Sequence, residues 1–101
     1  MFNLSWNKPL KVGKRDTYTI DVVSWSGGED VLAVTSSMAN GLATLVAHTL
    51  SENISGKMSI VGVTLIGAEE GIETVTLNYS TATRTDSVEV TLKVGETCLT
   101  Q

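Results

Sequence analysis

The chain has 101 residues, the size of one ordinary domain, and 42% of them are hydrophobic, which is enough for a single core. Its 11 acidic and 7 basic residues give a net charge of −4, which argues against nucleic-acid binding, because proteins of that class carry a basic face. No stretch approaches the roughly 20 apolar residues of a membrane span, and the N-terminus lacks the pattern of a secretory signal. We therefore expect no nucleic-acid partner and no membrane partner.

Strand-forming residues dominate the sequence. Val, Ile and Thr together account for 31 residues, and these β-branched side chains fit a pleated surface better than a helix. In chain order, alternating polarity and glycine-rich turns predict strands at residues 6–12, 17–25, 31–35, 42–50, 57–66, 73–79 and 87–94. That number and spacing predict an all-β fold, a single immunoglobulin-like antiparallel β-sandwich of about seven strands.

Four of these segments carry more specific expectations. Pro9 marks the first as an edge strand or a bent entry, because proline cannot donate to a ladder. Residues 42–50 fit a helical as well as a strand period, so strand is favoured there only because the neighbours are strands. Gly62 indicates a bulge or a close backbone approach. The last two strands, at 73–79 and 87–94, are expected to pair as an antiparallel hairpin.

The chain divides into an N-terminal arm or first edge strand at 1–12, the sandwich at 13–95 and a C-terminal tail at 96–101. The tail holds Cys98, the only cysteine, which is expected to be a free thiol because it has no intramolecular partner. No linker or repeat suggests a second domain.

The candidate partner contacts lie near the N-terminus. Phe2, Leu4 and Trp6 alternate, so the first six residues are predicted either to dock on another subunit or to form a strand of the domain's own sheet. Aromatic residues dominate binding hot spots, which makes Trp6 the preferred anchor. Lys14 and Arg15, in the turn that follows residue 12, are the secondary contacts.

The sequence offers little for catalysis or metal binding. His48 is the only histidine, so any nucleophilic triad or imidazole cluster would depend on it alone, and it is expected on a wet or half-buried strand face. The acidic pairs at 29–30 and 69–70 lie in loops without the repeated carboxylates of a calcium loop. We predict no catalytic residue, no cofactor and no metal, and hence a protein that is not an enzyme.

Two further side-chain roles are structural. Trp25, near the end of a predicted core strand, is expected to pack between the sheets. Arg84 and Asp86 flank the last turn and are predicted to bond to each other or to turn amides, which would fix the hairpin.

Several motifs follow one another from residue 16 to residue 94. They are DTYTID at 16–21, Trp25 with GGED at 27–30, LIGA at 65–68 and TRTD at 83–86 before the last strand. This pattern resembles the small immunoglobulin-like structural proteins of tailed bacteriophages. The resemblance carries no catalytic residues.

The resemblance implies a virion protein that binds a larger capsid, neck or tail assembly, as a decoration or fibre-associated component. Its partners would be other virion proteins. It would be located in the virion, after assembly in the host bacterial cytoplasm. For the oligomeric state, monomer, dimer and trimer all stay open. The alternative is an immunoglobulin-like module that recognises cell-surface carbohydrate, which would need aromatic residues exposed on a flat face or in loops.

Overall fold

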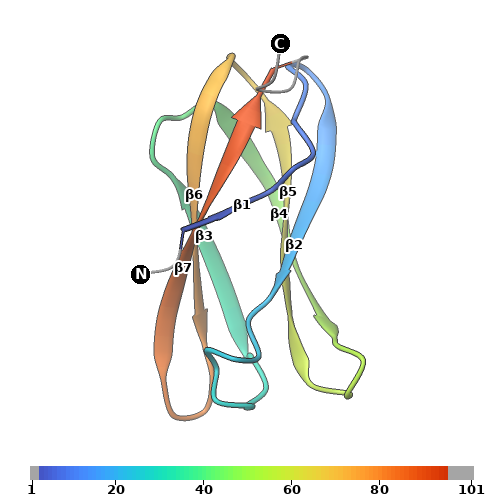
Figure 1. Cartoon of the computed structure of the whole chain (residues 1–101), viewed down its shortest axis with the longest axis vertical. Coiled ribbons are helices and arrows are strands. Elements are labelled where there is room, and N and C mark those ends of the chain that lie inside the picture. Colours follow the sequence, from blue (N-terminus) through green and yellow to red (C-terminus); the bar gives the residue numbers. More distant parts are fainter. Residues whose placement is uncertain (1–2, 96–101) are drawn as a thin grey trace.

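The computed structural model describes residues 3–95, which form seven strands in two layers (Figure 1). The strands are β1 (Asn3–Ser5), β2 (Arg15–Asp21), β3 (Ala33–Met38), β4 (Ala43–Glu52), β5 (Met58–Gly67), β6 (Gly71–Ser80) and β7 (Thr85–Val94). Residues 3–95 contain no helix. The all-β sandwich that the sequence predicts is confirmed.

The strand order identifies the sandwich as immunoglobulin-like. One sheet has the order β1-β7-β6-β3 and the other has the order β2-β5-β4. Immunoglobulin domains place their B, E and D strands in one sheet and their C, F and G strands in the other, and β2, β5, β4 and β3, β6, β7 take those positions here. The β1–β7 pair is parallel, whereas the other four pairs of strands are antiparallel.

The predicted closing hairpin is confirmed. β6 and β7 pair antiparallel over ten residues each, from Gly71 opposite Val94 to Ser80 opposite Thr85. Residues 81–84 form the connection, which is shorter than the alternation predicts because both strands extend beyond their alternating segments. The hairpin forms the centre of the four-stranded sheet.

The sequence leaves residues 42–50 open between helix and strand, and all of them except Leu42 lie in a strand. β4 pairs antiparallel with β5, and the register shifts once between Leu45 and Ala47 and again between Ser51 and Glu52. The first shift is a bulge in β4, where Val46 is the extra residue, and the second leaves Ser59 of β5 as the extra residue. Gly62 instead marks a close approach, because a Cβ there would meet the Thr49 and Thr19 side chains and lie 3.2 Å from the Tyr18 carbonyl oxygen.

The predicted first strand at 6–12 is wrong. The strand is β1, at Asn3–Ser5, and residues 6–12 cross from one sheet to the other. Leu10 forms a single bridge with Val94 of the first sheet, whereas Val12 forms one with Gly67 of the second. A segment that changes sheets within three residues cannot pair continuously with either of them.

The limits of two other predicted strands are shifted. β2 ends at Asp21 rather than at residue 25, because the Asp21 carboxylate accepts the Val23 amide (3.0 Å) and turns the chain. Residues 22–32 form a long connection that Val22 and Val31 anchor, through backbone bonds to Ser59 and Met58. β3 consequently begins at Ala33 and extends to Met38.

The core lies between the two sheets and uses the alternation that the sequence shows. Every second residue of β5, β6 and β7 is buried. The core cluster contains Leu10, Tyr18, Val22, Val31, Ala43, Val61, Val63, Leu65, Val75, Leu77, Tyr79, Val88, Leu92 and Val94. Fully burying one such side chain contributes about 1.5–3 kcal/mol, so this cluster supplies most of the driving force for folding.

One carboxylate is buried with these apolar residues. Glu73 has the same parity along β6 as Val75 and Leu77, and it is fully buried. Its oxygens accept the backbone amides of Asn40 (2.7 Å), Leu42 (2.8 Å) and Thr74 (3.1 Å). Glu73 therefore fixes the connection between β3 and β4 from the opposite strand.

Candidate functional site

Trp6 and Leu4, which the sequence offers as partner contacts, pack on the domain's own core. The Trp6 ring lies 5.1 Å from the ring of Tyr18, and its Nε1 donates to the Thr19 carbonyl oxygen (2.9 Å). Of the two alternatives for the N-terminal residues, the structure shows the strand at Asn3–Ser5. Phe2 lies outside the described residues. The interface role of Leu4 and Trp6 stays a prediction, but much of their surface is already used inside the domain.

Trp6 also helps to cover the free edge of β2. The Thr17 amide donates to the carboxylate of its neighbour Asp16 (2.9 Å), and Asp16 in turn pairs with Lys8 (2.8 Å). The bond from Lys8, together with that from Thr17, lowers the pKa of Asp16. The edge formed by β1, residues 6–8 and β2 is therefore capped by its own side chains, and we call it the closed side.

Lys14 and Arg15 lie at the start of β2, and both are exposed. The Lys14 carbonyl oxygen accepts the Gly67 amide (3.1 Å), and Arg15 pairs with Ile66 in the ladder. The backbone of both residues is thus held, while their side chains face outwards. Their contribution to a partner contact stays a prediction.

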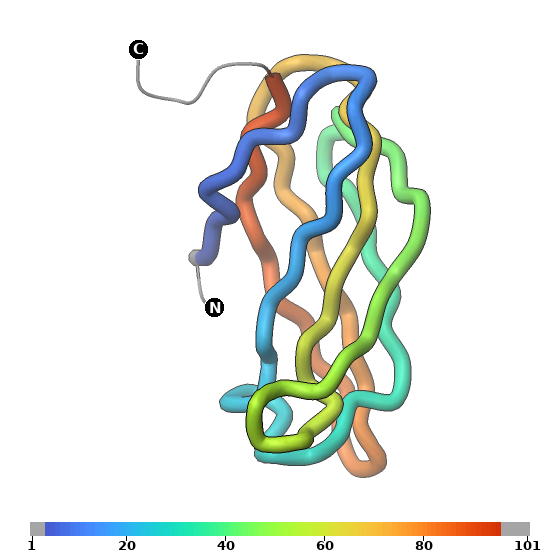
Figure 2. The backbone as a smooth tube through the Cα atoms, turned by 90° about the vertical axis from the view of Figure 1, so that its right-hand side faces the viewer, coloured from blue at the N-terminus to red at the C-terminus, as the bar shows by residue number. Residues whose placement is uncertain are grey.

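The opposite edge of the sandwich, formed by β3 and β4, is built differently. Ser36 and His48 join the two strands across the sheets, through a hydrogen bond between Oγ and Nε2 (2.8 Å). His48 is half-buried, as the sequence predicts. Within residues 3–95, no side chain hydrogen-bonds to the backbone of β3 or of β4. Figure 2 shows these strands running together on the side away from β1, and we call this edge the open side.

The open side carries no charge except that of Glu52 at the end of β4. Residues 31–51 contain no Asp, Glu, Lys or Arg, and Asp30 and Glu52 delimit this stretch, although 18% of the whole chain is charged. Large apolar side chains are exposed along it, with Leu32 at 65%, Val46 at 41% and Leu45 at 39%. Soluble proteins commonly protect an edge strand with charged residues, proline or bulges, and of these devices β4 has only the bulge at Val46 and the charge of Glu52 at its end.

One end of the sandwich carries three connections, at residues 22–32, 53–57 and 81–84 (Figure 1). Glu29 joins the first to the last, because its carboxylate accepts the hydroxyls of Thr81 (2.5 Å) and Thr83 (2.7 and 2.8 Å). These two bonds lower the pKa of Glu29. Asp30 accepts the Met58 amide (2.9 Å), which ties the long connection to β5. This loop end is therefore ordered by carboxylates.

Arg84 contributes to the loop end in a different way from the prediction. Its guanidinium lies over Gly27 and donates to the Trp25 carbonyl oxygen (3.3 Å), while Asp86 accepts the Ser87 amide (2.8 Å). The hairpin turn is held by the backbone bond from the Thr81 amide to the Arg84 carbonyl oxygen (2.8 Å) and by the Thr81 hydroxyl, which accepts the amides of Thr83 and Arg84. Trp25 lies in the connection after β2 and not in a core strand, and it is half-buried against the core; its expected place between the sheets stays a prediction.

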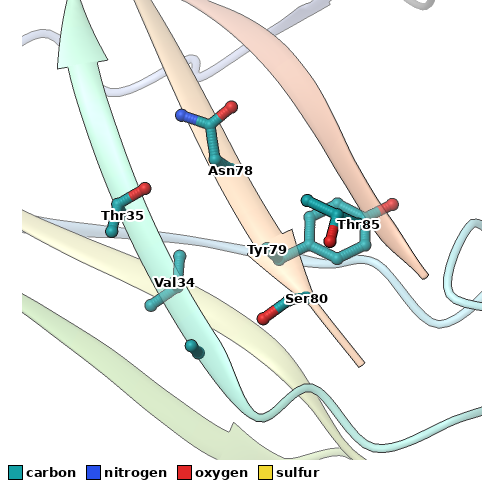
Figure 3. A pocket seen from close by; sticks show the side chains of 7 residues that line it. Val34, Thr35, Asn78, Tyr79, Ser80 and Thr85 are labelled. Carbon is teal, nitrogen blue, oxygen red and sulfur yellow. The ribbon is translucent and has the colours of Figure 1, made fainter. Parts of the chain in front are cut away.

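A shallow depression of about 100 Å³ lies on the outer face of the four-stranded sheet, where β3, β6 and β7 meet (Figure 3). It is lined by Ala33, Val34, Thr35, Asn78, Tyr79, Ser80 and Thr85. Its lining contains no charged residue, and its volume is well below that of a typical small-molecule site. No group of three or more His, Cys, Asp or Glu side chains in the described part of the chain is placed to hold a metal ion.

The comparisons with known proteins identify the fold but no family. No family model matches the chain, and no curated protein matches it. Domains 4 and 5 of the S-layer protein SbsC are similar in structure, with a TM-score of 0.56 and 23% identity over 91% of this chain. An endo-fucoidan hydrolase of glycoside hydrolase family 107 is similar over 95% of this chain, with a TM-score of 0.55 and 16% identity.

Both similar structures are longer than this chain, which covers 49% of the S-layer structure and 13% of the hydrolase. At these identities the similarity is one of fold alone. In the described part of the chain, no helix is long and apolar enough to span a membrane.

Sequence reasoning favours the N-terminal edge as the candidate site for a simple reason. It selects aromatic and basic residues, and Trp6 is such a residue, but Trp6 is used internally. The signal that would have found the open side is the uncharged stretch at 31–51, which is visible in the sequence. The bonds between Glu29 and Thr81 or Thr83 span 52 and 54 residues, and no local pattern predicts them.

Proposed function

We propose that this chain is a non-enzymatic structural protein, a small immunoglobulin-like domain that joins a larger assembly through its open side. The observation that carries the proposal is the coincidence of two uncapped edge strands with 21 consecutive residues, 31–51, that lack charge. Unpaired edge groups bind other polypeptide, and exposed apolar patches mark interaction sites.

The sequence resemblance to tailed-bacteriophage proteins suggests which assembly this is. A virion component is present in many copies and works by adhesion, so it needs a rigid domain with a docking surface more than it needs a pocket. The ordered loop end and the open side meet that need. The proposed partners are therefore capsid, neck or tail proteins of a phage particle assembled in the bacterial cytoplasm.

The experiment follows an epitope-tagged copy of the full chain through particle assembly. The tagged chain is expressed during growth of the phage that encodes it, and the particles are banded on a density gradient. The proposal expects the chain to band with the particles in a fixed ratio to the major capsid protein. A chain that stays in the soluble fraction at the top of the gradient contradicts the proposal.

A matched pair of variants assigns the contact to the open side. Val46 and Val12 are each 41% exposed, but Val46 lies on β4 and Val12 lies in the crossing segment before β2. Val46→Asp should remove the chain from the particle band, whereas Val12→Asp should leave it there. Equal retention of both variants would place the contact elsewhere.

Carbohydrate recognition is tested with the same protein. A glycan array probed with the full chain separates this alternative from a protein-docking role. Specific binding to one glycan class, with no chain in the particle band, would replace the proposed function with that of a carbohydrate-binding module.

A further inference from the structure

On the open side, the free edge of β4 is long, but only a short part of it lies between the two register shifts. β4 shifts register after Leu45 and again after Ser51, so residues 47–51 are the segment that pairs without interruption, with residues 60–64 of β5. On the far side of this segment, no described side chain or strand takes up the backbone groups. Water can hydrogen-bond to these amides and carbonyls one by one, whereas another extended strand pairs with the whole row.

The side chains of this segment suit an identical partner. If two copies of β4 pair antiparallel around Thr49, Thr49 lies opposite Thr49 of the second copy, Ala47 lies opposite Ser51, and His48 lies opposite Leu50. Threonine pairs are favourable across strands, and directly opposed like charges are not. Residues 47–51 contain no charged residue, so the register creates no repulsion.

The rest of the open side also allows the approach of a second copy. β3 and the connection from β3 to β4 lie within the uncharged stretch 31–51, so the nearest parts of the two copies carry no like charges. The closed side, by contrast, carries the charges of Lys8, Arg15 and Asp16, and in a two-fold contact each of them would have to lie near an opposite charge of the second copy. A two-fold contact places each patch against itself, and a neutral patch meets that condition.

We propose that two copies of this chain pair through their β4 strands, antiparallel and centred on Thr49, to give one continuous six-stranded sheet. The inference rests on the proposed use of the open side and names a second copy of the chain as its partner. One strand pair buries less surface than a standard stable interface, so the dimer should form in the range of about 1 µM to 1 mM.

The test uses the symmetry of the outer face around Gly62. Thr49 of β4 and Thr19 of β2 both pair with Gly62 and both are exposed. They differ in position, because Thr49 lies on the open side and Thr19 lies on the closed side. In the full chain carrying Cys98→Ser, Thr49→Cys places two thiols opposite each other in the proposed dimer, within reach of a disulfide. Thr19→Cys is the matched control.

Mild oxidation followed by non-reducing electrophoresis should give a species of twice 10.7 kDa for Thr49→Cys and mostly monomer for Thr19→Cys. Light scattering of the Cys98→Ser chain, with Thr19 and Thr49 unchanged, should show an apparent mass that rises with protein concentration. Thr49→Lys should abolish that rise and Thr19→Lys should not, with circular dichroism confirming that both variants are folded.

Three results would overturn the inference. These are a monomeric mass across the whole concentration range, equal crosslinking of the two cysteine variants, and a dimer that Thr49→Lys leaves intact. A chain that is monomeric throughout and still bands with phage particles would refute the β4 dimer alone, because the proposed function would then stand without it.

Discussion

Along β2 the chain covers its own free edge, whereas along β4 it leaves that edge bare. The closed side has an indole, a carboxylate and a lysine arranged over one strand. Among the described residues, the side chains of β3 and β4 form one bond, between Ser36 and His48, and the stretch from residue 31 to residue 51 carries no charge. Both edges belong to the same three-stranded sheet, so the difference comes from side-chain chemistry and not from topology.

The difference teaches that an aromatic residue near a terminus is not automatically a docking residue. Trp6 buries its ring against Tyr18 and bonds through its only polar atom, so it closes an edge of the domain. Threonine, alanine and leucine are not residue types that a sequence pattern singles out as docking contacts. Along β4, however, they leave the backbone accessible to another chain.

The largest expected effect is a loss of stability on the open side, caused by a substitution at the buried residue Glu73. Glu73→Gln keeps the shape of the side chain but presents an NH₂ group to backbone amides that now donate to a carboxylate. The loss of charge-assisted bonds from buried groups should lower the free energy of unfolding by about 2–5 kcal/mol. Urea denaturation measures this change. A loss below about 0.5 kcal/mol would show that Glu73 does not hold the β3–β4 connection.

The next effect is on the closed side. Trp6→Ala removes the contact with Tyr18 and leaves the Thr19 carbonyl oxygen without its donor. Because Trp6 is only partly buried, the free energy of unfolding should fall by about 2–4 kcal/mol, which is the lower end of the range for tryptophan-to-alanine changes. Leu45→Ala, at a partly exposed position on the open side, is the control and should cost less than about 1 kcal/mol. If the two variants unfold at the same urea concentration, the closed side is not closed by Trp6.

A smaller effect follows from pH. Burial raises the pKa of Tyr18 to about 12 from 10.0, and it also raises the pKa of Tyr79. A raised folded-state pKa contributes stability that is complete below about pH 10 and is lost as the pH rises through about 12. The absorbance of the phenolate form should therefore appear only well above pH 10, and it should appear together with unfolding. Titration of either tyrosine near pH 10 in the folded protein would contradict this.

The smallest effect concerns the ion pair of the closed side. Lys8 and Asp16 are well exposed, and such pairs contribute about 0–1 kcal/mol. Asp16→Asn should therefore change the urea midpoint little at neutral pH. The lowered pKa of Asp16 gives stability above its unfolded-state value of about 3.8, and this stability is lost as the pH falls through the folded-state pKa. The variant should remove that part of the acid dependence, which thermal melts between pH 2 and pH 6 would show.

The fold could be predicted from the sequence because its signals are local. Strict alternation in the last two strands and glycine-rich turns give the class, the number of strands and the closing hairpin. Strand limits were less predictable where a side chain ends a strand, as Asp21 does through the Val23 amide. The segment at 6–12 was predicted incorrectly because nothing local reveals that a chain changes sheets.

The candidate site was less predictable than the fold. Edge strands are defined by their neighbours in space, and the sequence does not say that β4 has a neighbour on one side only. The burial of Glu73 was visible in its parity with Val75 and Leu77, but two of its three amide partners lie more than thirty residues away. Lack of charge is informative once the topology shows that residues 31–51 form one edge of the sandwich.

Hydrogen exchange, followed at low and high protein concentration, tests the difference between the two sides most directly. The account predicts that exchange within β4 slows as the concentration rises, because a second chain covers its free amides, while exchange within β2 stays the same. If β4 is unaffected by concentration, or if β2 and β4 slow equally, the open side is not the surface that this protein leaves for another chain.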